Sequence, residues 1–234
     1  MSMITESLVD VLERISQTTQ KSGRTPNSVS LITVSKQVSV DRIEEARGAG
    51  AVIFGENKIQ EAIPKIAQLG WDEISWHFIG HLQKNKVKFL DERFDLIHSV
   101  DSFMLAEKIA RHCHSENRVQ RILLQVNVSG ETTKFGMEPS ELEKRMIDFS
   151  RLKGVNVAGL MTIPPFYSDP ENSRKHFSRL REIRDQCEKQ SGLLLPELSM
   201  GMSHDFQIAI EEGATLVRVG TAIFGSRQPK PGKN

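Results

Sequence analysis

The chain is poor in features that mark several other classes of protein. It has only two cysteines, Cys113 and Cys187, which are far apart and show no Cys-x-x-Cys spacing, so a disulfide framework is not indicated. No apolar run approaches the length of a membrane span, and residues 1–6 lack the basic start of a signal peptide. With 31 Lys and Arg against 30 Asp and Glu, no net field attracts nucleic acid or an anionic membrane. These absences predict a cytoplasmic protein that binds neither nucleic acid nor membrane.

The sequence does contain a regular alternation of short apolar runs and helical segments. An amphipathic segment at 8–21 predicts a helix that precedes the first strand. Runs rich in β-branched residues predict eight strands, at 29–34, 51–54, 76–79, 96–100, 121–128, 155–162, 197–200 and 215–219. Helical patterns lie between them at 41–49, 58–68, 84–90, 103–113, 140–152, 173–189 and 205–212.

This alternation predicts the fold class. Strands joined by helix-sized crossovers pair in parallel, because a tight hairpin cannot reach a parallel neighbour. Eight such units favour an α/β fold, a closed (β/α)8 TIM barrel with an extra N-terminal helix. A doubly wound open sheet is the alternative, but the first strand lacks the Gly-x-Gly-x-x-Gly loop that favours dinucleotide binding there. We expect one domain over residues 1–227 and a disordered tail at 228–234.

Lys36 is the first candidate for chemistry. Barrels of this kind build their active face from the C-termini of the strands, and Lys36 directly follows the first predicted strand. Partial desolvation there would favour the neutral amine that attacks a carbonyl. From position alone, a lysine that extends from the rim into water is the more common case. A reactive role for Lys36 is therefore indicated only when the neighbouring residues are considered with it.

Two glycine turns at neighbouring strand ends predict an anion site. The segment 219–225 runs from a strand through Gly220 into a short helix, and Thr221 adds a hydroxyl and an amide. The loop at 200–203 adds another glycine and the hydroxyl of Ser203. Barrel phosphate sites commonly use the loops after strands seven and eight. A structural helix cap is the competing interpretation.

Arg218 lies on the last predicted strand, just before this turn. A ring whose phosphate is held by Gly220 and Thr221 would place its nitrogen within reach of the guanidinium. Because a guanidinium stays protonated, it donates to a pyridine nitrogen and leaves that nitrogen unprotonated, which weakens the ring as an electron sink. The competing interpretation is an ion pair between Arg218 and a rim carboxylate such as Glu56.

Together these motifs resemble those of the pyridoxal phosphate homeostasis protein family, which is related to the barrel half of alanine racemase. The resemblance covers nearly the whole chain. It depends on the segments 34–36 (VSK), 54–57 (FGEN), 76–80 (WHFIG), 82–86 (LQKNK), 159–161 (GLM), 198–203 (LSMGMS) and 218–225 (RVGTAIFG). One departure within a matching block is His81, to which we assign no role.

The resemblance implies a barrel like the N-terminal domain of alanine racemase, known as fold type III of the proteins that use pyridoxal 5′-phosphate (PLP). It implies a carrier or buffer of PLP, without established turnover, whose partners are PLP-requiring apoenzymes. The implied cofactor-binding set comprises Lys36 for a Schiff base, Ser203, Gly220 and Thr221 for the phosphate, Arg218 for the pyridine nitrogen, Asn57 and Met202 for the ring, and Ser199 without an assigned role.

Enzymes are the alternatives to a carrier. Racemases of the related fold use a second, β-rich domain that supplies a tyrosine base, whereas the only tyrosine here, Tyr167, lies in the loop after the sixth strand. A second base of that kind has no obvious source, so we expect little or no racemase activity. A cofactor-free Schiff-base lyase acting on phosphorylated sugars would use the same lysine and phosphate loop. An exposed barrel mouth leads us to expect a monomer.

Two further groups of residues give weaker indications of function. His112, Cys113 and His114 resemble metal ligands, but consecutive helical residues point in different directions, so we expect no metal site. Lys84 and Lys86 belong to a run that is usually a solvated helix face. Because the run lies near the predicted barrel mouth, our hypothesis is that one of these two lysines takes the cofactor transiently during transfer.

Overall fold

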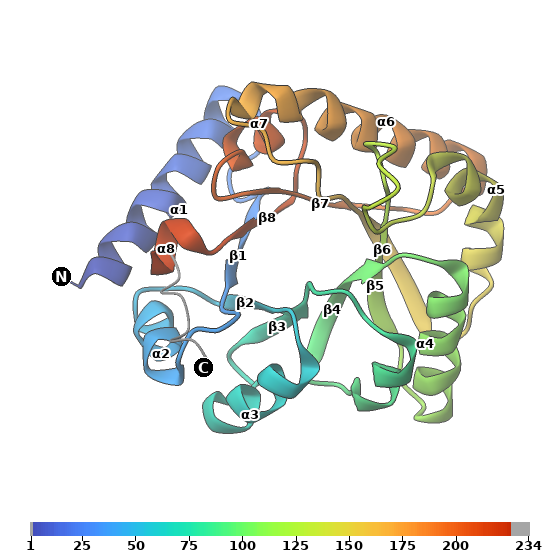
Figure 1. Cartoon of the computed structure of the whole chain (residues 1–234), viewed down its shortest axis with the longest axis horizontal. Helices are drawn as coiled ribbons and strands as arrows, with labels where there is room; N and C mark the ends of the chain where they lie inside the picture. Colours follow the sequence, from blue (N-terminus) through green and yellow to red (C-terminus); the bar gives the residue numbers. More distant parts are fainter. Residues whose placement is uncertain (1, 226–234) are drawn as a thin grey trace, which may run out of the picture.

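Eight parallel strands close into a barrel in the computed structural model, which describes residues 2–225 (Figure 1). The strands are β1 Ser30–Val34, β2 Ile53–Glu56, β3 Ser75–Phe78, β4 Phe94–Val100, β5 Gln120–Gln125, β6 Val155–Met161, β7 Glu197–Met202 and β8 Leu216–Val219. Each strand pairs with the next in sequence, and β8 closes on β1, where Ile32 lies opposite Arg218. The predicted (β/α)8 barrel is confirmed, and this closure excludes the open sheet.

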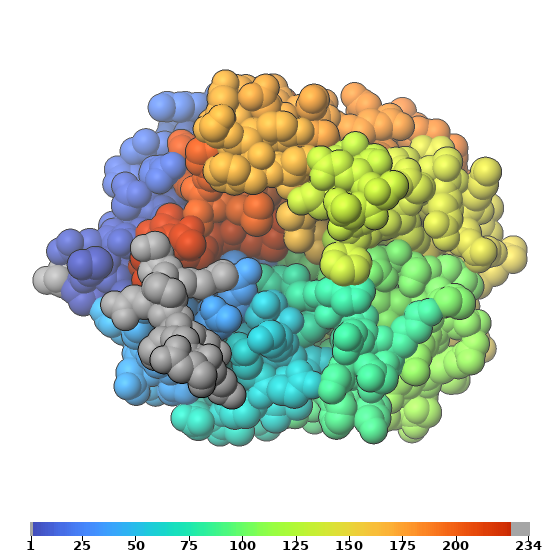
Figure 2. Space-filling model, in the orientation of Figure 1, coloured from blue at the N-terminus to red at the C-terminus, as the bar shows by residue number. Residues whose placement is uncertain are grey.

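The helices form a ring around the strands (Figure 1). They are α1 Met3–Lys21, α2 Val40–Gly48, α3 Ile59–Leu69, α4 Phe103–Ser115, α5 Pro139–Ser150, α6 Arg174–Ser191, α7 Phe206–Glu211 and α8 Thr221–Phe224, with the 3-10 helices η1 Lys84–Phe89 and η2 Pro170–Ser173. The predicted N-terminal helix begins before residue 8, because the Ser2 hydroxyl caps it by accepting from the Thr5 N–H. In a space-filling view, the red and orange C-terminal segments lie directly beside the blue N-terminal ones (Figure 2).

Apolar side chains form two cores. The larger lies between the strands and the helices, and Leu8 of α1 and Phe177 of α6 belong to it. The smaller fills the barrel interior and consists of Ile32, Leu96, Leu123, Ala158, Met161 and Leu216. Because side chains alternate along a strand, His98 shares the inward face of β4 with Leu96, and Arg218 shares that of β8 with Leu216. Polar residues therefore enter the interior from β4 and β8.

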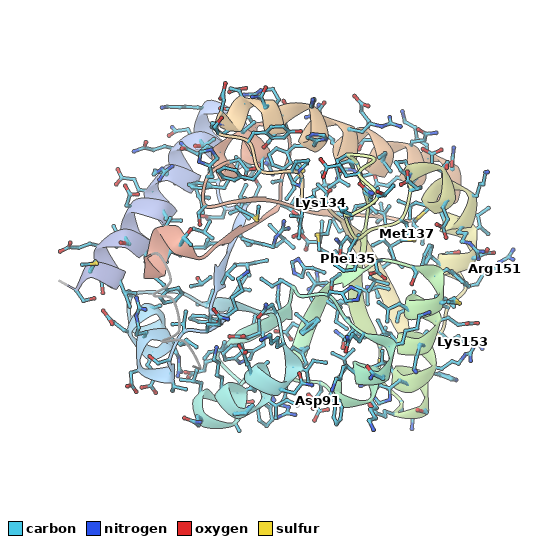
Figure 3. The ribbon with its side chains drawn as sticks, viewed as in Figure 1. Asp91, Lys134, Phe135, Met137, Arg151 and Lys153 are labelled. Carbon is cyan, nitrogen blue, oxygen red and sulfur yellow. The ribbon has the colours of Figure 1, made fainter. Side chains whose placement is uncertain are left out.

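The loop after β5 reaches across to the loop after β3. Lys134, Phe135 and Met137 belong to this loop (Figure 3), and the Phe135 ring stacks on the His81 ring at 4.1 Å between centroids. This contact joins two loops at the carboxyl end of the barrel.

Three expectations concern the chain as a whole. The domain boundary expected at residue 227 and the tail expected at 228–234 lie outside the described residues. Within 2–225, no helix is long and apolar enough to cross a bilayer. Cys113 and Cys187 are free and buried, as expected for reduced thiols.

Candidate functional site

A cleft of about 290 Å³ opens at the carboxyl ends of β1, β7 and β8. Its volume is close to the lower end of small-molecule sites, about 300 Å³. Six of the eight predicted cofactor-binding residues line it, namely Lys36, Met202, Ser203, Arg218, Gly220 and Thr221. The remaining lining residues are Val34, Ile79, Ile163, Phe166 and His204, which are mainly apolar. The cleft thus combines an amine, a buried guanidinium and a glycine turn within apolar walls.

A buried ion pair fixes the backbone that carries Lys36. The hydroxyl of fully buried Ser35 donates to Glu56 Oε1 at 2.6 Å. Lys65 of α3 donates to the same Oε1 at 2.6 Å and to the Ser35 carbonyl oxygen at 2.7 Å. Burial raises the pKa of Glu56, and the contacts with Lys65 and Ser35 oppose that rise. Glu56 therefore pairs with Lys65, and the alternative pairing with Arg218 is wrong.

The turn after β8 directs backbone donors at one oxygen. The N–H groups of Gly220 and Ala222 both donate to Ser203 Oγ, at 3.3 and 3.4 Å. A Cβ at position 220 would lie 3.2 Å from Val34 Cβ and 3.3 Å from the Val34 carbonyl oxygen, so glycine lets the turn approach β1. Converging N–H groups beside a hydroxyl fit a phosphate group.

Arg218 is 5% exposed and is one of the residues that line the cleft. It donates to Ser199 Oγ at 2.5 Å and to the Thr162 carbonyl oxygen at 2.9 Å. Burial lowers its pKa to about 10, so the side chain is charged at neutral pH. Ser199 is fully buried and lies behind Arg218. We conclude that Ser199 reaches the cleft only through the guanidinium.

Two histidines extend this hydrogen-bonded chain across the barrel interior. His98 Nδ1 lies 2.8 Å from Ser199 Oγ, and His98 Nε2 lies 3.0 Å from His77 Nδ1. His77 Nε2 lies 3.1 Å from Ser75 Oγ, near the start of β3. Desolvation lowers the pKa of His77 to about 3 and that of His98 well below its usual value. Both rings are therefore neutral at physiological pH.

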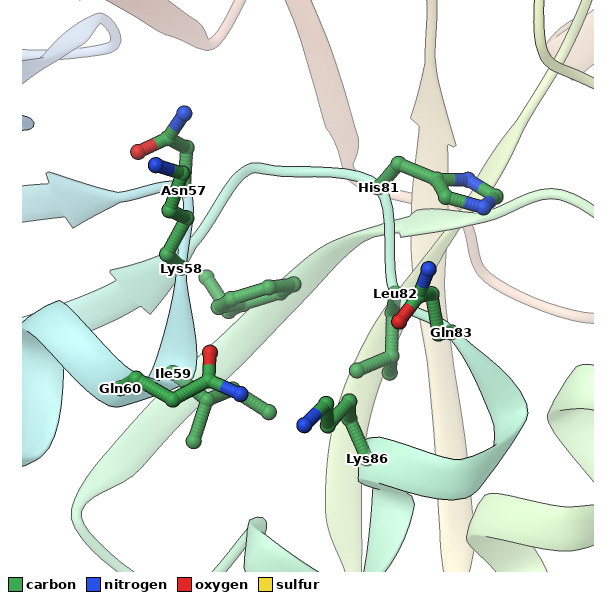
Figure 4. Close-up of a pocket in the computed structure, with 9 residues that line it drawn as sticks. Asn57, Lys58, Ile59, Gln60, His81, Leu82, Gln83 and Lys86 are labelled. Atoms are coloured by element: carbon green, nitrogen blue, oxygen red, sulfur yellow. The ribbon is translucent and has the colours of Figure 1, made fainter. Parts of the chain in front are cut away.

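Asn57 lines a second cleft, of about 400 Å³, between the start of α3 and the loop after β3 (Figure 4). It is not among the described residues that line the first cleft. Its Oδ1 is buried and has no hydrogen-bond partner within 2–225. Ile79 lines the first cleft and His81 lines the second, so the loop after β3 separates them. A contact between Asn57 and a cofactor ring stays a prediction.

The two lysines near the barrel mouth lie in different places. Lys86 lines the second cleft, and Figure 4 shows its amine directed toward the side-chain amide of Gln60. Lys84 instead lines a cleft beside α4 that includes Met104 and Glu107. The structure therefore gives these two lysines different surroundings.

Neither Tyr167 nor the histidine and cysteine cluster is among the described residues that line the first cleft, although Phe166, next to Tyr167, is. The Tyr167 hydroxyl lies 2.9 Å from His176 Nε2, and the two rings stack. His112 Nε2 donates to the Leu90 carbonyl oxygen, while Cys113 is buried in the larger core. In the described part of the chain, His, Cys, Asp and Glu form no group of three or more that could hold a metal ion.

Sequence reasoning missed Lys65 and the pair His77 and His98. Period-two alternation places His98 on the same face of β4 as Leu96, which is a usable signal for an interior histidine. A buried carboxylate such as Glu56 also requires a cation. No pattern in the sequence identifies Lys65 as that cation, because it occupies an ordinary helical position.

Fold and site together define a class of protein, a parallel barrel with a lysine after β1 and an anion-type turn after β8. The family model described as "Alanine racemase, N-terminal domain" matches residues 12–228. A solved alanine racemase from Clostridium difficile has a TM-score of 0.74 at 15% identity, with 96% of this chain and 58% of that chain covered. At that identity the likeness concerns the fold alone.

The chain belongs to the alanine racemase N-terminal domain family and, within it, to the pyridoxal phosphate homeostasis proteins. The protein of that name from Aquifex aeolicus is 46% identical over 223 residues, which cover 95% of this chain and 98% of that protein. The one from Escherichia coli K12 is 35% identical over 235 residues, with 97% and 98% covered. The structure of PipY from Synechococcus elongatus with PLP bound has a TM-score of 0.84 at 38% identity and covers 95% of this chain and 100% of that chain.

Proposed function

We propose that this protein binds PLP through Lys36 and acts in PLP homeostasis as a carrier or buffer. One observation carries the proposal, the position of Lys36, Arg218 and the Gly220 turn on a single cleft. The names of the relatives support the homeostasis role, and the solved PipY with PLP bound supports the ligand.

The residues of the cleft fit the three parts of this coenzyme. Lys36 supplies the amine that condenses with the aldehyde. Ser203 and the N–H groups of Gly220 and Ala222 hold the phosphate, where the start of α8 favours negative charge. Arg218 donates to the pyridine nitrogen and keeps it unprotonated. When bound, PLP supplies an electron-accepting ring for amines.

A visible spectrum followed by borohydride reduction and peptide mapping tests this assignment. We expect the protein to purify yellow or to take up PLP, and borohydride to fix one label on Lys36. Lys36→Ala should remove the label, whereas Lys86→Ala, at the neighbouring cleft, should retain it. A label on another lysine in the wild-type protein would refute the assignment. Trapping that requires a phosphorylated sugar would favour the lyase instead.

The protein is proposed to sustain little or no racemase turnover. The Tyr167 hydroxyl already contacts His176, and an arginine at the ring nitrogen gives a weaker electron sink than an aspartate. The test is incubation of the loaded protein with L-alanine and chromatographic separation of the enantiomers. Conversion by the wild type that Lys36→Ala abolishes would overturn this part of the proposal.

Transfer of PLP to apoenzymes is proposed to involve Lys86 rather than Lys84. Lys86 lines the cleft that the loop after β3 separates from that of Lys36, whereas Lys84 lies beside α4. Stopped-flow transfer to a PLP-requiring apoenzyme should slow in Lys86→Ala and stay unchanged in the matched Lys84→Ala. Transfer at the wild-type rate in both variants would count against a role for either lysine, and equal slowing in both would contradict the preference for Lys86.

We also propose a monomer located in the cytoplasm. The two free, buried thiols fit a reducing compartment. Sedimentation of the pure protein tests the monomer, and fractionation of cells tests the compartment.

A further inference from the structure

Arg218 is the only member of a hydrogen-bonded chain through the barrel interior that the binding roles given above use. This chain passes from Arg218 to Ser199, His98, His77 and Ser75, with contacts of 2.5, 2.8, 3.0 and 3.1 Å. We propose that Ser199 and His98 are positioning residues, which orient the Arg218 guanidinium toward the ring nitrogen of the coenzyme. This inference rests on the proposed function, because it concerns the same site.

The direction of the hydrogen bonds follows from which of these side-chain groups can donate and which can accept. A guanidinium only donates, so Ser199 Oγ accepts from Arg218. The Ser199 hydroxyl then donates to His98 Nδ1, since the described residues offer it no other acceptor. His98 therefore carries its proton on Nε2 and donates to His77 Nδ1. A reversed chain would leave the buried Ser199 hydroxyl hydrogen without a partner, which is costly.

The donor and acceptor roles at the far end of the hydrogen-bonded chain are fixed in the same way. With Nδ1 of His77 accepting from His98, its proton lies on Nε2 and is donated to Ser75 Oγ. Both imidazoles are neutral because burial and the nearby charges of Arg121 and Arg218 disfavour a second proton. Neutral rings can each donate one bond and accept one bond, which is what this chain requires.

Burial makes the chain a rigid support for the guanidinium. Ser199 and His98 are each 0% exposed, so bulk water does not compete for their hydrogen bonds. The second anchor of Arg218 is the Thr162 carbonyl oxygen at 2.9 Å. Without the Ser199 contact, the Thr162 carbonyl oxygen would be the remaining hydrogen-bond acceptor of the guanidinium among the described residues, and one acceptor fixes its orientation less well than two.

Variants of His98 separate its two ring nitrogens. In His98→Asn, the amide oxygen lies near the former Nδ1 and still accepts from Ser199, while the contact with His77 is lost. In His98→Gln, the amide reaches the former Nε2 and the acceptor for Ser199 is lost. Ser199→Ala removes the contact with Arg218 directly. Ser75→Ala, at the far end, is the matched control.

A comparison of two ligands measures what the contact with the ring nitrogen contributes to affinity. Affinity is measured for PLP and for the analogue that has carbon in place of the pyridine nitrogen. The wild type should prefer PLP, and Ser199→Ala and His98→Gln should lower that preference about tenfold, as expected for loss of a hydrogen bond to a charged group. His98→Asn and Ser75→Ala should keep the preference within about twofold. A loss of affinity that is equal for both ligands would show a merely structural role and overturn the proposal.

The unloaded protein provides an independent readout. Long-range ¹H–¹⁵N correlation should show His98 and His77 as neutral rings protonated on Nε2. Protonation of His98 on Nδ1 would overturn the assigned direction whatever the ligands do. If the wild type binds neither ligand, the proposed function fails. The tautomers of His98 and His77 would still show the direction of the hydrogen bonds in the barrel interior.

Discussion

Acidification is expected to destabilise the barrel through its interior histidines. Burial lowers the pKa of His77 from 6.5 to about 3, and that of His98 in the same direction. Below pH 6.5 the unfolded chain binds protons at both rings that the folded chain does not, so the free energy of unfolding falls as the pH falls toward 3. At about 1.36 kcal/mol per proton and pH unit, His77 alone lowers it by about 2 kcal/mol between pH 7.5 and pH 5. His98 adds to this loss.

Urea unfolding followed by tryptophan fluorescence between pH 5 and 7.5 measures the effect. His77→Asn removes one buried titrating ring and leaves an acceptor for His98. Below pH 6, the slope of the free energy of unfolding against pH should therefore correspond to about one proton fewer than in the wild type. Protonation of Glu56, whose pKa is raised, acts in the opposite sense but cancels in the comparison of the two proteins. His114→Asn, at an exposed histidine, is the control.

An equal loss of stability on acidification in the wild type and in His77→Asn would contradict this prediction. That result would mean that His77 is already protonated in the folded barrel at pH 5, or that the barrel opens locally to let water reach it.

The remaining predictions concern the ion pair under Lys36 and the anion turn. Lys65→Met should lower the free energy of unfolding by about 3–5 kcal/mol, since it leaves Glu56 buried without its counter-charge, and adding Glu56→Gln should recover part of that loss in urea unfolding. Gly220→Ala should weaken PLP binding about tenfold in a fluorescence titration, because the new Cβ would press on Val34. Gly48→Ala, where a Cβ would meet nothing within 4 Å, should bind PLP as the wild type does.

The sequence predicts the barrel well because its pattern is local. β-branched runs and helical periods recur along the chain, and each run marks a strand of the observed barrel. The helical segment at 84–90 is a 3-10 helix, η1, of six residues, a length that periodicity cannot separate from a short α-helix. The fold was thus readable without knowledge of its tertiary contacts.

The candidate site was readable only in part. Lys36, Ser203 and Gly220 follow strands whose ends share one edge, so their proximity follows from the topology alone. The contact of Glu56 with Lys65 depends on how α3 packs against β2, and that of His98 with Ser199 spans the barrel interior. Such contacts are set by packing between elements, which residue spacing does not encode.

The pairing of β8 with β1 makes one site from the two ends of the sequence. Thr33 lies opposite Val219 in this pair, so the next residues of both strands, up to Lys36 and Gly220, emerge on the same edge. A ligand that contacts both segments binds only while this pairing exists, and therefore stabilises the folded chain. At a free PLP concentration of about 100 times Kd, the free energy of unfolding should rise by about 2.7 kcal/mol. A urea midpoint that PLP leaves unchanged, although PLP labels Lys36, would show that the turn at Gly220 takes no part in binding.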